Sequence, residues 1–167
     1  MNRRFMTIIL TLVLVLTAGP VFAEQKIGYL DLSRVFDEYQ KTKEYDAALE
    51  VRHSAFEKER NVKIDKLKEA QGKMALLKED EKAKVQQEIE SLRADLMEFD
   101  RQNKTDLTKE RDEKIREILL EIEKIVSDYA KKQNYSFIFN DRVLIYGAEP
   151  LNVSEDVLKI LNAGYSK

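Results

Sequence analysis

Apolar residues in the middle of the chain recur at alternating intervals of three and four positions. This spacing places them along one stripe of a helix and is typical of coiled coils. The stripe positions are Ile64, Leu67, Gln71 and Met74, then Val85, Ile89, Leu92, Leu96 and Phe99, then Ile115, Leu119, Ile122, Val126 and Tyr129. Between residues 100 and 114 the only aliphatic residue is Leu107. We expect the helices to pack less tightly there.

The stretch that carries these stripes runs from Ser33 to about Asn134 and contains no proline and one glycine, Gly72. Its residues are mostly Glu, Lys, Arg, Gln, Ala and Leu, which are good helix formers. Ordinary helices have about 11–12 residues, so this length predicts a coiled coil or a long helical hairpin. Asp31 or Ser33 can cap its first turn. Asn134 can adopt the left-handed conformation that often ends a helix.

The register of the apolar stripes favours the hairpin. Charged residues occupy the stripe positions in segment 78–82, and Asp80 can cap a second helix that begins there. If the chain folds back at this segment, the facing pairs are Met74 with Val85, Leu67 with Leu92, Ile64 with Leu96, and Phe36 and Tyr39 with Ile122 and Leu119. We therefore predict an antiparallel hairpin with its tip near residues 78–82 and arms of about 45 residues, roughly 65–70 Å long.

The distribution of charge supports the same register. Segment 60–78 has six basic and two acidic residues, and segment 88–100 has five acidic residues and one basic. An antiparallel hairpin lays these two segments side by side, whereas one continuous parallel coil would set like charges beside each other. Each exposed pair contributes only about 0.5 kcal/mol, but many pairs together select the register.

Short segments rich in β-branched and aromatic residues flank the helical stretch. Lys26–Leu32 is predicted to be a strand, and Phe137–Phe139 and Val143–Tyr146 are predicted to be two strands around a turn at Asn140 and Asp141. Asn152 or Ser154 can cap a last short helix, whose apolar residues are Val157, Leu158, Ile160 and Leu161. Three strands and one short helix do not form a stable core alone, and the edges of such a sheet tend to pair with another chain.

The predicted fold class is therefore α+β, with a long antiparallel helical hairpin projecting from a small β body. The body comprises residues 24–35 and 130–167, and the arm comprises residues 36–129. We expect homo-oligomerisation through the body. The residues expected to build this oligomerisation body are Ile27, Tyr29, Leu30, Phe137, Phe139, Leu144 and Tyr146.

The first 23 residues have the features of an export signal. Arg3 and Arg4 form a basic start, Phe5–Leu16 is apolar, and Val21–Ala23 suits cleavage after Ala23. The apolar part is shorter than the about 20 residues that a membrane-spanning helix needs, although an uncleaved anchor is the alternative. The chain has no cysteine, which excludes a thioether lipid anchor and disulfides. We expect a soluble mature chain outside the cytoplasm.

Charge and motifs argue against nucleic-acid binding and against catalysis. Without Arg3 and Arg4, the 29 basic residues become 27 against 31 acidic ones, a net charge of about −4, whereas nucleic-acid binders are normally basic. The single histidine, His53, lies on a charged helix face and is expected to be an ordinary surface residue. No glycine-rich phosphate loop, zinc pattern or nucleophile motif is present. We expect no catalytic residue, no cofactor and no metal site.

The segments at both ends of the hairpin resemble the Skp (OmpH-like) family of periplasmic chaperones. The most specific matches are KIGYLDLSRVF at residues 26–36, YSFIFND at 135–141 with VLIY at 143–146, and SEDVLKIL at 154–161. The resemblance covers essentially the whole mature chain and implies a homotrimer with an intersubunit β-barrel. It also implies that three helical arms enclose a cavity, which holds unfolded outer-membrane proteins without ATP. The chain is acidic where the best-known members are strongly basic, so lipopolysaccharide or membrane-surface binding is not carried over.

A chaperone of this kind needs many weak contacts. Unfolded outer-membrane strands alternate apolar and polar residues, so a surface that mixes exposed aliphatic and charged side chains can bind them reversibly. The apolar arm residues outside the stripes are the expected client contacts, and these are Val62, Leu76, Leu77 and Met97. The alternative function is that of a structural coiled-coil spacer or adaptor in the cell envelope.

Overall fold

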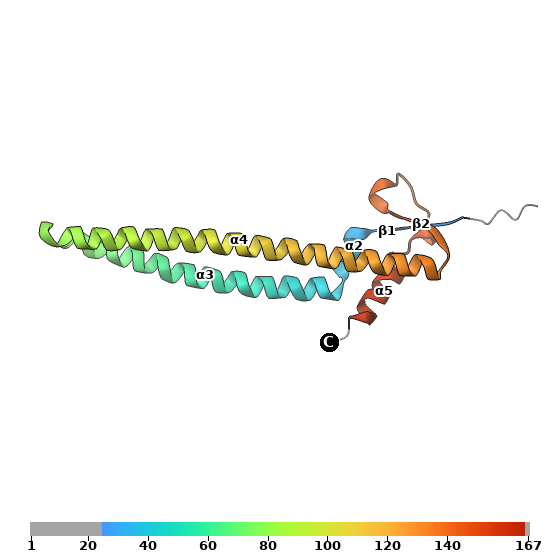
Figure 1. The fold of residues 1–167 in the computed structure, drawn as a ribbon, viewed down its shortest axis with the longest axis horizontal. Coiled ribbons are helices and arrows are strands. Elements are labelled where there is room, and N and C mark those ends of the chain that lie inside the picture. The colour runs from blue at the N-terminus through green and yellow to red at the C-terminus, as the bar shows by residue number, and fades with distance from the viewer. Residues whose placement is uncertain (1–24, 166–167) are drawn as a thin grey trace, which may run out of the picture.

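The computed structural model describes residues 25–165, which form one long helical arm and a small body at its base (Figure 1). The chain begins with β1 (Lys26–Leu30) and α2 (Leu32–Glu38), then runs out along α3 (Gln40–Met74) and back along α4 (Glu79–Lys132). It ends with β2 (Tyr135–Asn140), two short 3₁₀ turns and α5 (Ser154–Gly164). The predicted signal peptide, residues 1–23, lies outside the described residues. Within the described part, no helix is long and apolar enough to cross a membrane.

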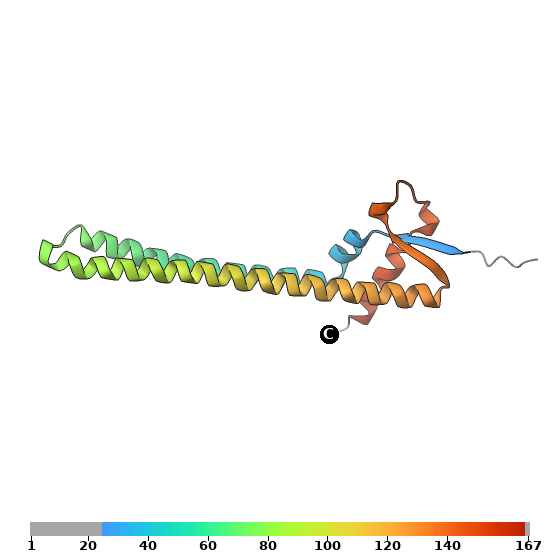
Figure 2. The same cartoon turned by 45° about the horizontal axis from the view of Figure 1, so that its top comes forward.

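The two long helices form the predicted antiparallel hairpin, and both views show them side by side along their length (Figures 1 and 2). Arg60 of α3 pairs with Asp100 of α4 at 3.0 Å, which joins the basic segment to the acidic one as the register predicts. Arg52 pairs with Glu110 in the same register. The hairpin and its register are therefore confirmed.

The tip of the hairpin lies slightly earlier than the charged segment suggests. α3 ends at Met74 and α4 begins at Glu79, so the turn comprises residues 75–78. Lys78 occupies the N-cap position of α4 without a side-chain bond, and Asp80 lies in the first helical turn. The prediction that Asp80 caps this helix is wrong. Three acidic side chains near the positive helix end stabilise it instead.

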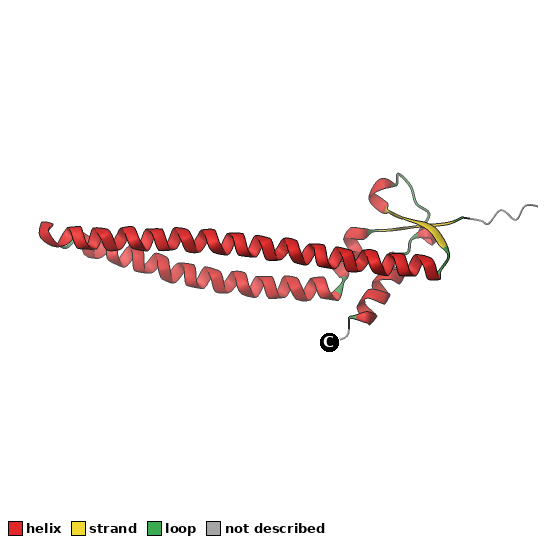
Figure 3. Ribbon diagram, in the orientation of Figure 1, coloured by secondary structure: helices red, strands yellow, loops and turns green. Residues whose placement is uncertain are grey.

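The first long helix is interrupted at Tyr39, which the sequence does not predict. The backbone of Tyr39 is extended, with φ −64° and ψ 128°, so α2 and α3 are separate helices joined by one residue. Figure 3 shows the short loop between them. The outgoing part of the arm is therefore α3 alone, 35 residues or about 52 Å long, which is shorter than predicted. Asp31 caps α2 as predicted, by accepting from the Arg34 amide.

The body contains one two-stranded parallel sheet. β1 pairs with β2 in a register that sets Gly28 beside Ile138 and Tyr29 beside Phe139. The whole arm is thus the crossover connection that parallel strands require. α4 has 54 residues against 35 in α3, so it extends past the start of α3 and returns the chain to β1. Asn134 follows α4 with φ 58°, the left-handed conformation expected of it.

The predicted strand at Val143–Tyr146 is absent from the described chain. The residues after β2 form a 3₁₀ turn at Asp141–Val143, and the next three carry no regular structure. A β-hairpin turn would have placed this segment beside β2, but the chain arcs away from the sheet instead (Figure 2). The prediction of a third strand is therefore wrong for the single chain.

The hydrophobic core lies where α2, α4, α5 and β1 meet. The buried side chains of this cluster, called the base core below, are Leu30, Val35, Tyr39, Ile118, Ile122, Val153, Val157, Leu158 and Leu161. On α4, Ile118 is buried in place of Leu119, which remains 37% exposed. The three-four spacing placed Leu119 on the stripe, and the structure corrects this because α4 here faces α2 and α5 as well as α3. Neither the intersubunit barrel nor the trimer is visible in one chain, and both stay predictions.

Candidate functional site

The arm exposes apolar side chains on an otherwise charged surface. Leu76 at the tip is 89% exposed, Met97 on α4 is 73% exposed, and Val62 on α3 is 54% exposed. Leu77, in the turn between the two helices, is only partly exposed. These positions fall outside the stripes that join the two helices. Their side chains are therefore available to a partner along most of the length of the arm.

Two further exposed aliphatic residues belong to the same surface and were missed by the sequence reasoning. Val51 on α3 is 69% exposed and Leu120 on α4 is 59% exposed. Both also lie outside the apolar stripes, so the criterion that selected Val62 and Met97 could have found them. Together these residues distribute apolar contacts from the base of the arm to its tip, rather than concentrating them in one pocket.

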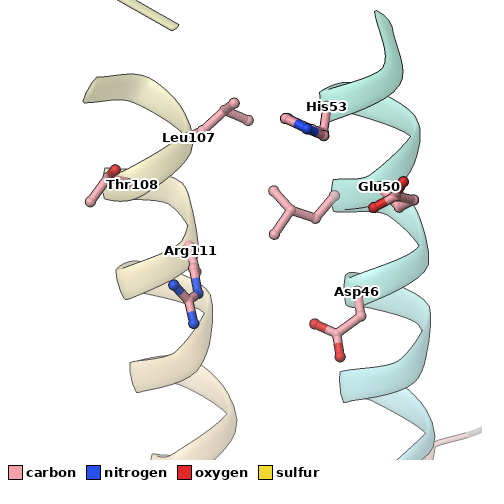
Figure 4. A pocket seen from close by; sticks show the side chains of 7 residues that line it. Asp46, Glu50, His53, Leu107, Thr108 and Arg111 are labelled. Atoms are coloured by element: carbon pink, nitrogen blue, oxygen red, sulfur yellow. The ribbon is translucent and has the colours of Figure 1, made fainter. Parts of the chain in front are cut away.

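The part of the arm nearer the body contains an open groove between α3 and α4. The groove has a volume of about 410 Å³, and it is lined by Asp46, Leu49, Glu50, His53, Leu107, Thr108 and Arg111. In Figure 4 His53 and Leu107 point toward each other across the gap between the helices. The groove therefore mixes apolar, acidic and basic side chains. No group of three histidine or carboxylate side chains in the described residues is placed to hold a metal ion.

Side-chain bonds to the backbone follow one another on α4 beside this groove. Asn103 donates to the carbonyl oxygen of Phe99, Thr105 to that of Arg101, and Thr108 to that of Lys104. Each bond reaches back four residues, an arrangement that weakens and often bends a helix. These bonds are a second reason, besides the lack of aliphatic residues, to expect loose packing between residues 100 and 114.

An ion-pair cluster holds α3 to α4 close to the body. Lys41 contacts Glu117 at 2.8 Å and Glu121 at 2.7 Å, and Tyr39 donates from its hydroxyl to Glu121 at 3.0 Å. Hydrogen bonds from Lys114 and Lys41 lower the pKa of Glu117 to about 2. Burial, followed by the bond to Glu121, raises the pKa of Tyr39 to about 12. The base of the arm is therefore fixed by bonds that involve both of its helices.

The sheet of the body exposes one apolar face. Gly28 and Leu30 of β1 are buried, and Leu30 belongs to the base core. The alternate residues point the other way: Ile27 is 41% exposed and its partner Phe137 53% exposed. Phe137 and Phe139 stack with ring centroids 5.9 Å apart. We call Ile27, Phe137 and Phe139 the open sheet face.

The segment after β2 extends this apolar surface. Tyr146 is 83% exposed and Val143 and Ile145 are also exposed, while Leu144 is half-buried. Tyr29 is half-buried, and its hydroxyl donates to the carbonyl oxygen of Gly147. Of the seven residues expected in the oligomerisation body, Leu30 therefore packs inside the chain, Tyr29 and Leu144 are partly covered, and the others are open.

Known proteins share both the sequence pattern and the architecture of this chain. The family model described as outer membrane protein (OmpH-like) matches residues 26–161. A solved structure of a candidate outer membrane chaperone (OmpH-like) from Caulobacter crescentus CB15 superimposes with a TM-score of 0.78. The alignment has 11% identity and covers 87% of this chain and 88% of that one, so it establishes the shared fold. A search of curated proteins gave no match. Because the family model spans both strands, the whole arm and most of α5, the chain belongs to the OmpH-like outer membrane protein family.

Proposed function

We propose that this protein is an ATP-independent chaperone of the periplasm that holds unfolded outer-membrane proteins in a cavity between helical arms. The observation that carries the proposal is the arm surface, on which Val62, Leu76 and Met97 are exposed among charged residues. An unfolded outer-membrane strand alternates apolar and polar residues, and such a surface offers partners to both. The sequence contains no glycine-rich phosphate loop, zinc pattern or nucleophile motif, and the proposal includes no catalytic step or cofactor.

The proposed assembly is a homotrimer joined through an intersubunit β-barrel. The open sheet face exposes two stacked phenylalanines that a monomer would leave in water, and burial of apolar surface yields about 25 cal/mol per Å². The outer edge of β2 and the exposed segment 143–146 supply further groups for pairing with another chain. Joining several arms at one body raises the overall affinity for a client that makes many weak contacts, although no single site binds tightly.

The assembly is tested first, by light scattering of residues 24–167 on a sizing column. A trimer with an elongated profile is expected. Replacing Phe137 and Phe139 by serine should shift the mass toward the monomer, whereas the exposed neighbour Ser136→Ala should leave it unchanged. A parent protein that is monomeric or dimeric would remove the enclosed cavity from the proposal.

Client holding is tested by dilution of urea-unfolded outer-membrane β-barrel proteins into buffer with and without the chaperone. The parent protein should suppress turbidity for several unrelated barrels without ATP. The triple replacement of Val62, Leu76 and Met97 by serine should reduce suppression several-fold, because exposed apolar contacts are lost while the fold is kept. Asn61→Ser with Gln87→Ser, which changes exposed polar residues of the same arm, is the matched control.

The result also separates the chaperone from an envelope spacer. A spacer or adaptor binds one partner in a fixed ratio and leaves unrelated unfolded barrels to aggregate. Equal turbidity with and without the protein, for every barrel tried, would overturn the proposed function.

A further inference from the structure

The arm is attached to the body at two places that differ in construction. α4 passes from the arm into the body without interruption, as the continuous helix in Figure 1 shows. α3 is separated from the body helix α2 by the extended residue Tyr39. A joint of one residue does not by itself fix the direction of the helix that follows it. The ion pairs of Lys41 hold the start of α3 to α4, and a second set of contacts holds it to the body.

The last turn of α5 and the residue that follows it contact this joint and the start of α3. The first N–H groups of a helix have no partner within it, and Tyr39 provides no side-chain cap for α3. The Gln40 amide donates instead to Asn162 Oδ1 of α5, over 2.8 Å. A side chain 122 residues further along the chain thus acts as the N-cap.

Tyr165 makes the second contact, directly after α5. Its ring packs edge-to-face on Tyr39, with centroids 5.7 Å apart. Its hydroxyl donates to Glu44 Oε2 at 3.1 Å, one turn into α3. Asn162 and Tyr165 therefore contact Tyr39, Gln40 and Glu44, which are the joint itself and the first turn of the arm helix.

The earlier turns of α5 are bound to the body by a separate set of contacts. Val157, Leu158 and Leu161 are buried in the base core. Asp156 accepts from the Tyr129 hydroxyl at 2.9 Å, and Glu155 pairs with Arg34 at 2.9 Å. The contacts to the body and the contacts to α3 thus come from different ends of the same helix. The end that touches α3 can be altered while the helix stays in place.

We propose that Asn162 and Tyr165 are positioning residues that clamp the start of α3 and thereby set the direction of the arm. With the clamp, the arm is fixed at two points and α4 is supported along its length. Without it, α3 follows α4 alone, and a single long helix bends. For the proposed chaperone this clamp governs how far the arms stand apart, so it bears on the size of client that the cavity admits.

The test measures arm direction in the full chain with no client present. The chain has no cysteine, so Ser54→Cys on α3 and Lys131→Cys at the body end of α4, both exposed, can carry two spin labels. Labelled chains are diluted into an excess of unlabelled chains, and the distance distribution between the labels is recorded by electron–electron double resonance. N162A and Y165A should each broaden the distribution, and the double variant should broaden it most.

Conservative variants distinguish a clamp from a general loss of structure. N162D keeps an oxygen that accepts the Gln40 N–H and should restore the narrow distribution. Y165F keeps the ring and loses the bond to Glu44, so it should fall between the parent and Y165A. The melting temperature of the double variant should fall less than that of a base-core truncation such as Ile122→Ala, because Tyr165 packs on the outside of the base core and the buried side chains of α5 are kept.

A double variant with the parent distribution, or N162D as broad as N162A, would overturn the inference. Only the effect of the clamp on client size rests on the proposed function. The clamp itself is tested separately, since the distances are measured on the protein alone. A failed holding assay with a broadened distribution rejects the proposed function and leaves the clamp. A successful holding assay with an unchanged distribution does the reverse.

Discussion

At the base of the molecule, Val35, Ile118 and Val157 are at most 1% exposed, whereas in the arm only Ala70 and Ile89 are buried among the apolar side chains described. The arm is held by other means. Arg60 and Arg52 form ion pairs across it, and Phe56 stacks on Phe99 with centroids 5.4 Å apart.

This difference shows how one chain combines a stable base with an arm whose surface keeps apolar side chains exposed. The base core removes most of its apolar area from water and fixes a single arrangement. The arm needs only enough contact to keep two helices in register, so many of its aliphatic residues remain outside the seam. A surface suited to weak and varied contacts is a direct consequence of that division.

Truncation in the base core should have the largest effect. Ile122→Ala removes a side chain that is 1% exposed, and such changes cost about 2–5 kcal/mol. The melting temperature should fall strongly, and the spectroscopic signals of helix and sheet should be lost in the same transition. Leu120→Ala, two residues away and exposed, is the control and should change stability by less than about 0.5 kcal/mol. Equal effects of the two would contradict the assignment of the core.

A methyl group added in the body sheet should also destabilise the protein. It overfills a packed site, whereas the Ile122 truncation leaves a cavity. A Cβ on Gly28 would lie 2.9 Å from the Tyr135 ring and 3.3 Å from the Leu151 carbonyl oxygen. Overpacking of this kind costs about 1–3 kcal/mol. Gly28→Ala should therefore lower the melting temperature, and pairing it with Tyr135→Leu, which removes part of the ring, should recover some of the loss. No recovery would mean that the backbone contact dominates.

Acid should weaken the attachment of the arm to the base. The pKa of Glu117 is lowered to about 2 in the folded chain, against about 4.3 for an unperturbed glutamate. The unfolded chain therefore binds this proton first as the pH falls, and the stabilisation present above about pH 5 is lost toward pH 2. Glu117→Gln should show a smaller fall in melting temperature between pH 6 and pH 3 than the parent, while Glu123→Gln on the exposed side of α4 should behave like the parent.

A glycine-to-alanine substitution should stabilise the arm at Gly72, although the same substitution should destabilise the body at Gly28. A Cβ on Gly72 meets nothing within 4 Å, and this residue lies inside α3. Glycine within a helix is less favourable than alanine by about 0.5–1 kcal/mol. Gly72→Ala should raise the stability of the arm by that order, measured as slower amide exchange in α3. A loss of stability would show that the arm is packed more tightly here than the structure describes.

The arm was the part that the sequence predicted best. Its hairpin follows from three-four spacing and from the basic and acidic segments, both of which act locally and repeat many times. Arg60 and Asp100 meet where that reasoning places them. Four residues were predicted to contact clients because they fall off the stripe. The structure exposes Val62, Leu76 and Met97, whereas Leu77 is half-buried.

The base was predicted less well because its structure depends on contacts between distant residues. The break at Tyr39 has no proline or glycine to signal it. At the break, Asn162 of α5 accepts the Gln40 N–H and Tyr39 is buried in the base core, and both contacts come from residues far away in the sequence. Segment 143–146 has the composition of a strand, yet one chain offers it no partner. The burial of Ile118 in place of Leu119 likewise reflects α5, which periodicity along α4 does not reveal.

The smallest effect should come from the ion pair that helps to set the register of the arm. Arg60 and Asp100 are each 35% exposed and lie 3.0 Å apart, and pairs at such sites contribute about 0.2–1 kcal/mol. A double-mutant cycle with Arg60→Gln and Asp100→Asn should give a coupling energy in that range by chemical denaturation. The coupling should shrink as salt is raised, because screening weakens partly exposed pairs. A coupling above the range that is insensitive to salt would mean that the arm, like the base, depends on buried contacts, and the contrast between the two regions would not hold.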